Sequence, residues 1–146
     1  MSIPELTSNG ELPPGEYEVT IDEVEERFGS SNPKRKALMK GLRAAARNLK
    51  EAGIQRIWIN GSFVTSKPEP KDVDGCWEYS REMNLVVLDP VFINRSRLPM
   101  KAKYGIEFFI SAIMEVDSGL PFPRFFQLNR DGEPKGIVVV NLGGAE

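Results

Sequence analysis

Hydrophobic side chains recur at helical spacing in the first third of the chain. Within residues 33–52, apolar positions three or four residues apart are Leu38, Leu42, Ala45 and Leu49. This spacing is typical of a helix that buries one face. Ser31 or Asn32 can cap its start, Pro33 suits the first turn, and Gly53 can end it. We therefore predict an amphipathic helix over residues 33–52, packed against a sheet.

A shorter helix is predicted to begin after Thr20 and to end near Phe28. Thr20 and Glu23 fit a capping box, in which each side chain binds the backbone N–H of the other. The segment is acidic, with Glu16, Glu18, Asp22, Glu23, Glu25 and Glu26. The long helix that follows is basic on its polar side, with Lys34, Arg35, Lys36, Lys40, Arg43, Arg47 and Lys50. We interpret the acidic residues as a solvated face that faces the basic helix. The alternative is that they form a surface that binds a partner.

After residue 53 the hydrophobic pattern changes to short runs and alternation, which favour strands. Strands are predicted over residues 55–60, 72–79, 105–115 and 136–142, and the last is apolar enough to be buried on both faces. A short helix should begin at Pro90, a basic link should follow over residues 95–103, and aromatic residues 122–126 should plug the core. The first 19 residues carry strong turn signals and are predicted to form an extended arm with little structure of its own.

These elements predict an α+β protein with a mixed central sheet of about four to five strands and helices packed on one face. The 146 residues suffice for one domain with a real core, which we place at residues 20–146 after the arm at residues 1–19. Hydrophobic residues make up 40% and charged residues 27%, an ordinary globular composition. The net charge of −2 gives no overall basic field to attract nucleic acid or an anionic membrane.

The residue types that are missing restrict the chemistry. The sequence has no histidine, which excludes imidazole-based triads and histidine zinc ligands, and its single cysteine excludes an internal disulfide or a multi-cysteine zinc site. No targeting segment precedes the domain and no apolar run reaches membrane-spanning length, so we expect a cytoplasmic protein. Carboxylates, Lys, Arg, hydroxyl groups and metals such as magnesium or manganese remain for any catalysis.

Candidate chemistry gathers between residues 57 and 79. A buried strand is followed by Gly61 and Ser62, and after a loop come Asp72 and Asp74. Two carboxylates at positions i and i+2 of an extended segment project from the same face. Oxygen ligands are those that magnesium prefers, and a glycine followed by a serine lets backbone N–H groups approach a phosphate. The pattern predicts a site for a nucleoside triphosphate and its metal, with plain turn acids as the alternative.

This Gly-Ser and Asp-x-Asp pattern resembles the signature of the nucleotidyltransferase superfamily with the polymerase-beta-like fold, in particular its minimal bacterial members. The segments LPPG, ERFG, GSFVTSKPEPKDVD, KAKYG with EFF, and FFQ with NRDGEPKGIV resemble an uncharacterised bacterial family described as nucleotidyltransferase-like. The second resemblance covers nearly the whole chain. The first covers residues 57 to about 110.

The resemblance implies a magnesium- or manganese-dependent transfer of a nucleotidyl group from a nucleoside triphosphate to a protein, RNA or small-molecule acceptor. It assigns the metals to Asp72 and Asp74 and the phosphates to Gly61 and Ser62. It also implies a third carboxylate on a later strand, for which Glu107 is the candidate, either as a metal ligand or as a base. Lys67 stands near the place of an arginine found in minimal members, so Lys67 is the candidate for a further phosphate contact.

Two other functions stay open. Minimal nucleotidyltransferases often pair with small ribonuclease toxins, so the resemblance also implies an interaction protein of the same fold, such as an antitoxin-like partner of a toxin. A third hypothesis is a nucleic-acid binder that uses the basic residues of 34–50 and 95–103. No aromatic side chain is interleaved there for base stacking, which counts against it.

Overall fold

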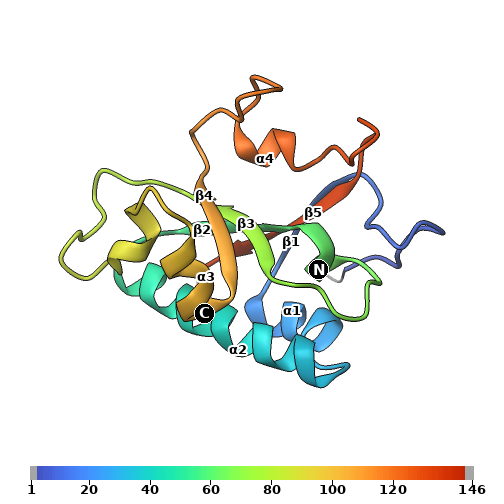
Figure 1. The fold of residues 1–146 in the computed structure, drawn as a ribbon, viewed down its shortest axis with the longest axis horizontal. Helices are drawn as coiled ribbons and strands as arrows, with labels where there is room; N and C mark the ends of the chain where they lie inside the picture. Colours follow the sequence, from blue (N-terminus) through green and yellow to red (C-terminus); the bar gives the residue numbers. More distant parts are fainter. Residues whose placement is uncertain (1–2, 144–146) are drawn as a thin grey trace.

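The computed structural model describes residues 3–143, which form an α+β domain around a five-stranded mixed sheet (Figure 1). The strand order is β1-β5-β2-β3-β4. Strands β1 and β5 are parallel, as are β3 and β4, and β2 is antiparallel to both of its neighbours. The strands are β1 (Gly15–Val19), β2 (Arg56–Asn60), β3 (Val73–Trp77), β4 (Ile106–Ile110) and β5 (Gly136–Asn141). The first two residues of the predicted arm and the last three of the predicted domain lie outside the described residues.

The helices lie on both sides of this sheet. They are α1 (Ile21–Phe28), α2 (Pro33–Glu51), α3 (Leu98–Tyr104) and α4 (Phe122–Phe125), with short 3-10 helices η1 (Gly61–Val64) and η2 (Pro90–Ile93). In Figure 1, α1, α2 and α3 lie along one face and α4 lies on the other side. Each helix within residues 3–143 is too short or too polar to cross a lipid bilayer.

Local capping signals locate the first two helices, as predicted. The Thr20 hydroxyl accepts a hydrogen bond from the Glu23 N–H at 3.1 Å, and the Glu23 carboxylate accepts one from the Thr20 N–H at 2.8 Å. Asn32 caps α2 by accepting from the Arg35 N–H at 2.8 Å. Both helix starts therefore follow from side chains within three residues of the cap.

The acidic segment faces the basic helix, as interpreted from the sequence. The guanidinium of Arg43 on α2 forms ion pairs with Asp22 and Glu25 of α1. These contacts raise the pKa of Arg43, chiefly through the hydrogen bond with Asp22. Part of the basic face is thus engaged within the molecule.

Alternate residues of the strands bury into two separate clusters. The larger one joins α1, α2 and α3 to the sheet through side chains such as Ile57, Ile59, Trp77, Phe108 and Val138. The smaller one joins α4 to the opposite face and contains Trp58, Cys76, Phe122, Phe126, Ile137 and Val139. The prediction that helices pack on one face is therefore wrong for α4, because the aromatic residues 122–126 form a helical turn that covers the second face.

The predicted arm is partly ordered into the sheet. Residues 15–19 form β1, whose register with β5 runs from Gly15 opposite Gly136 to Val19 opposite Val140. Leu12, just before the strand, is buried. The expectation of little structure is wrong for this stretch because its pairing partner lies about 120 residues later in the chain, where no local pattern reveals it.

Two other boundaries differ from the prediction. The basic link contains α3, which has a proline in its first turn and ends at Gly105 with a φ of 70°. Both are ordinary helix boundary signals that the charge pattern obscured. Strand β4 ends at Ile110, five residues before the predicted end, because the chain turns at residues 111–112.

Candidate functional site

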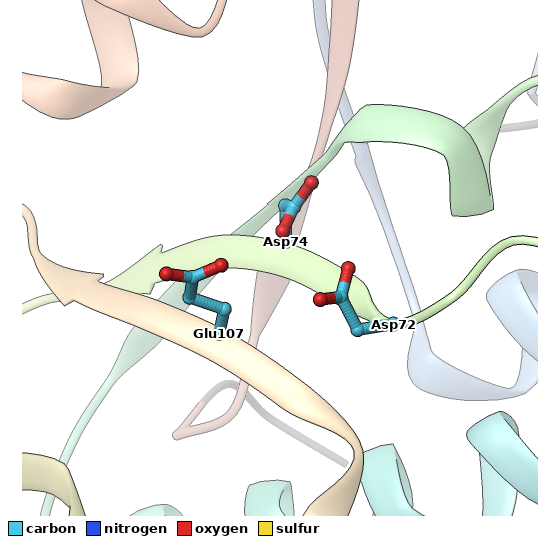
Figure 2. Close-up of side chains that lie close together, drawn as sticks. All are labelled: Asp72, Asp74 and Glu107. Carbon is cyan, nitrogen blue, oxygen red and sulfur yellow. The ribbon is translucent and has the colours of Figure 1, made fainter. Parts of the chain in front are cut away.

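Three carboxylates meet at the β3–β4 edge of the sheet, on the face that carries α4 (Figure 2). Asp74 lies on β3 directly opposite Glu107 on β4, and Asp72 precedes β3 by one residue. Asp72 and Asp74 share a face because side chains alternate along an extended chain. One oxygen of each residue lies within 4.8 Å of the others. We call Asp72, Asp74 and Glu107 the carboxylate cluster.

Burial and the neighbouring carboxylates shift the pKa of Asp74. Burial raises the pKa of Asp74 to about 7, and the nearby carboxylates of Asp72 and Glu107 add to the shift. A carboxyl group with such neighbours is favoured in its neutral form unless a cation lies close by. A cation close to the carboxylate cluster would favour the ionised form of Asp74.

An internal cation already approaches two of the three carboxylates. Lys101 on α3 places its Nζ 3.3 Å from a Glu107 oxygen and 3.5 Å from an Asp72 oxygen. The Glu107 carboxylate, followed by Asp72, raises the pKa of Lys101. These are partly exposed ion pairs, which contribute little stability each. A divalent ion with oxygen ligands can compete with this single ammonium group for the carboxylates.

The Gly61–Ser62 turn follows β2 and lies against Asp74. Gly61 has a φ of 78°, and a Cβ atom on it would lie 2.5 Å from the Asp74 Oδ2 atom. Only glycine combines this backbone conformation with this approach. The predicted phosphate-binding turn and the predicted metal ligands are therefore brought into direct proximity.

Replacing Gly61 by alanine should lower the free energy of unfolding by about 2–3 kcal/mol, because both the positive φ and the contact with Asp74 oppose a side chain. Urea denaturation measures the change. Gly132→Ala is the matched control, since Gly132 has a φ of 79° but nothing within 4 Å of an added Cβ. Its cost should be about 1 kcal/mol, from backbone conformation alone. Equal costs for the two variants would contradict the importance of the contact with Asp74.

The buried Arg35 side chain of α2 holds the Gly61–Ser62 turn and the loop that follows it. It is 3% exposed, and its guanidinium donates hydrogen bonds to the backbone carbonyl at the end of α1 and to four carbonyls in and after the turn, at Phe28, Ser62, Phe63, Thr65 and Lys67. Burial lowers the pKa of Arg35. The sequence placed Arg35 on the polar side of α2, and that placement is wrong, because the loop of residues 61–67 folds over it and supplies carbonyl acceptors.

A pocket of about 400 Å³ opens beside the carboxylate cluster. It is lined by Asp74, by the Gly61–Ser62 turn and by residues of the 128–135 segment, among them Arg130 and Lys135. Asp74 thus belongs to both the cluster and the pocket. A ligand in this pocket would contact both the Gly61–Ser62 turn and Asp74.

The structure brings five of the six predicted site residues together and leaves one outside. Asp72, Asp74, Glu107, Gly61 and Ser62 lie in the cluster or the pocket. Lys67 is exposed and does not line the pocket, because the chain turns away after Thr65. The sequence hypothesis missed Lys101 and Lys135. Lys135 directly precedes β5, but only the antiparallel pairing of β5 with β2 brings it beside Asn60.

The fold and the site define an α+β protein with a carboxylate cluster and an adjoining pocket at one face of a mixed sheet. The chain belongs to the Family of unknown function (DUF6932), whose profile matches residues 4–141. Neither a search of curated proteins nor a search of solved structures found a match. The resemblance to nucleotidyltransferases therefore stays a prediction.

Proposed function

We propose that this protein is a magnesium- or manganese-dependent nucleotidyltransferase that acts on a hydroxyl group of a protein, RNA or small molecule. One observation carries the proposal. Asp74 is shared between a three-carboxylate cluster and a pocket that begins at a Gly-Ser turn. Nucleotidyl transfer needs a cation to neutralise the phosphate charge and a turn that binds the phosphates beside it. The carboxylate cluster would hold the cation, and the adjoining Gly-Ser turn would bind the phosphates.

The residues present fit a divalent metal ion of the hard type. Asp72, Asp74 and Glu107 offer carboxylate oxygens from three residues, and magnesium and manganese prefer such ligands. When bound, the ion supplies Lewis-acid polarisation of a phosphoryl oxygen. Burial, followed by the nearby carboxylates of Asp72 and Glu107, raises the pKa of Asp74, and a bound cation would favour the ionised form, which supports the fit.

The remaining residues position the nucleotide. Gly61 lets the turn approach Asp74 without a side chain, and Ser62 lines the pocket, where its hydroxyl would bind a phosphate oxygen. Arg35 holds the same turn through the carbonyl groups of Ser62 and Phe63. In the proposed reaction the acceptor hydroxyl oxygen forms a bond to the α-phosphorus and gives its proton to a carboxylate of the cluster. The bond from the α-phosphorus to the α–β bridging oxygen breaks, and pyrophosphate leaves with that oxygen.

Incubation with α-labelled nucleoside triphosphates, magnesium and cell extract tests the proposal. The wild-type protein should transfer label to an acceptor, and Asp72→Asn and Asp74→Asn should each lower transfer at least 100-fold, because each removes a ligand charge. Asp117→Asn, an exposed acid outside the cluster, is the control and should act like the wild type. Equal label transfer by the Asp72 and Asp74 variants would exclude the proposed chemistry.

The interaction-protein alternative is favoured by one observation, the bridging of Asp72 and Glu107 by Lys101. A lysine that neutralises the cluster suits a protein that keeps the fold without turnover. Affinity purification from the native cell discriminates between the two. A stoichiometric partner that is retained by the Asp72→Asn, Asp74→Asn double variant, together with no label transfer by the wild type, would favour binding over catalysis.

A further inference from the structure

A half-buried ammonium group lines the pocket beside the carboxylate cluster. Lys135 lies immediately before β5, and its Nζ donates a hydrogen bond to the Oδ1 atom of Asn60. Asn60 is itself buried, at the last position of β2. This hydrogen bond holds the Lys135 side chain at the pocket wall, next to the Gly61–Ser62 turn.

This ammonium group has a neutral partner in place of a carboxylate. Within residues 3–143, Lys135 forms no ion pair of 4.0 Å or shorter, whereas Lys101 and Lys103 each pair with an acid. An ammonium group has three donors, and the hydrogen bond to Asn60 uses one of them. The others are available to an acceptor in the pocket.

Burying this charge without a counter-ion is unfavourable. Burial lowers the pKa of Lys135 to about 8, while the acids Glu11 and Asp74 oppose that shift. An anionic group bound in the pocket would supply the missing charge. Arg130 lines the same pocket and adds a second cation. The pocket wall also carries three acids, Glu11, Asp74 and Asp131, so an anion is favoured only close to Lys135 and Arg130.

We infer that Lys135 binds the phosphate chain of a nucleoside triphosphate, with Asn60 as its positioning residue. The inference rests on the proposed function and deepens it, because it names the polyphosphate group as the part of the substrate that the pocket holds. It also transfers to Lys135 the role that the sequence assigned to Lys67. Lys67 is exposed and separate from the pocket lining, whereas Lys135 lines the pocket and contacts Asn60, the residue before the turn.

Calorimetric titration of the full chain with tripolyphosphate, and with a non-hydrolysable ATP analogue in the presence of magnesium, tests the inference. Lys135→Met keeps most of the length of the side chain and removes its charge, and it should weaken binding of both probes at least tenfold. Lys67→Met is the matched control and should stay within twofold of the wild type. Lys135→Arg should retain most of the affinity, since it restores the charge.

Two further measurements separate a phosphate contact from a structural effect. Manganese binding in the absence of nucleotide, followed by electron paramagnetic resonance, should be unchanged in Lys135→Met because the carboxylate cluster is intact. Asn60→Ala should weaken tripolyphosphate binding less than Lys135→Met, since the lysine remains but is no longer held. If Lys135→Met fails to fold, the comparison of Lys135→Arg and Asn60→Ala with the wild type still measures the contact.

The outcomes distinguish this inference from the proposed function. Wild-type affinity for tripolyphosphate in Lys135→Met, or no binding by the wild-type protein, overturns the role of Lys135. Tripolyphosphate binding that depends on Lys135, combined with no label transfer by the wild type, leaves the phosphate contact standing and overturns only the transferase activity.

Discussion

Arg35→Ala is expected to lower the free energy of unfolding by about 3–5 kcal/mol. The substitution removes the shared donor of five hydrogen bonds to backbone carbonyls, at Phe28, Ser62, Phe63, Thr65 and Lys67. Buried acceptors that lose their partner cost about 1–3 kcal/mol each, less where water enters the gap. The guanidinium also lies 5.3 Å from the centre of the Phe63 ring, a contact that is lost as well.

Urea denaturation followed by circular dichroism measures this effect. Arg47→Ala is the control, because Arg47 is an exposed residue of the same helix, and its change should stay within about 0.5 kcal/mol. Arg35→Lys should recover only a small part of the loss, since a single ammonium cannot reach acceptors spread around a planar fork. A loss below 1 kcal/mol in Arg35→Ala would show that the carbonyl groups find other partners.

Asp74→Asn should have the opposite effect on stability and raise the free energy of unfolding by about 1–3 kcal/mol at pH 8 in the absence of divalent metal. The pKa of Asp74 is about 7 in the folded protein against a reference value of 3.8. Between these values the folded state binds more protons than the unfolded state, so stability falls as pH rises from about 4 to 7. Asparagine cannot ionise and does not incur this loss.

The pH dependence provides the decisive measurement. The wild-type protein and Asp74→Asn should differ little near pH 3, where both side chains are neutral, and should diverge as the pH rises toward 8. Asp131→Asn, an exposed acid at the same pocket, is the control and should show no such divergence. Magnesium or manganese should raise the melting temperature of the wild type at pH 8 and have little effect on Asp74→Asn. A less stable Asp74→Asn at pH 8 would contradict the raised pKa of Asp74 in the folded protein.

Sequence patterns predicted the elements whose signals are local. Helices α1 and α2 follow from caps and apolar spacing within a few residues, β2 and β5 follow from short apolar runs, and β3 follows from strand-forming residues such as Trp77. Strand β1 and helix α3 were missed. Strand β1 exists because of pairing with β5, and α3 was obscured by the lysines that surround its proline and glycine boundaries.

Some residues of the candidate site also follow from local sequence patterns, and others depend on how distant segments pack. Asp72 and Asp74 follow from the alternation of one strand, and Glu107 could be placed beside them once a later strand was assumed to be a neighbour. Lys101 and Lys135 depend on how α3 and the 128–135 segment pack, which no short motif encodes. Lys67 was chosen because it stands near the place of an arginine in minimal nucleotidyltransferases, but it is exposed and does not line the pocket.

The position of β5 has a consequence for how the protein folds. This strand lies between β1 and β2, so one of its neighbours belongs to the first 19 residues and the other precedes it by some 80 residues. Contacts between residues far apart in the sequence slow folding, because the chain loses the entropy of loop closure before these contacts stabilise the structure. During synthesis, β1 can pair only after residues 136–141 have left the ribosome. We therefore expect slow, late closure of the sheet, with β1 and the adjoining edge of β2 exposed to chaperones until then.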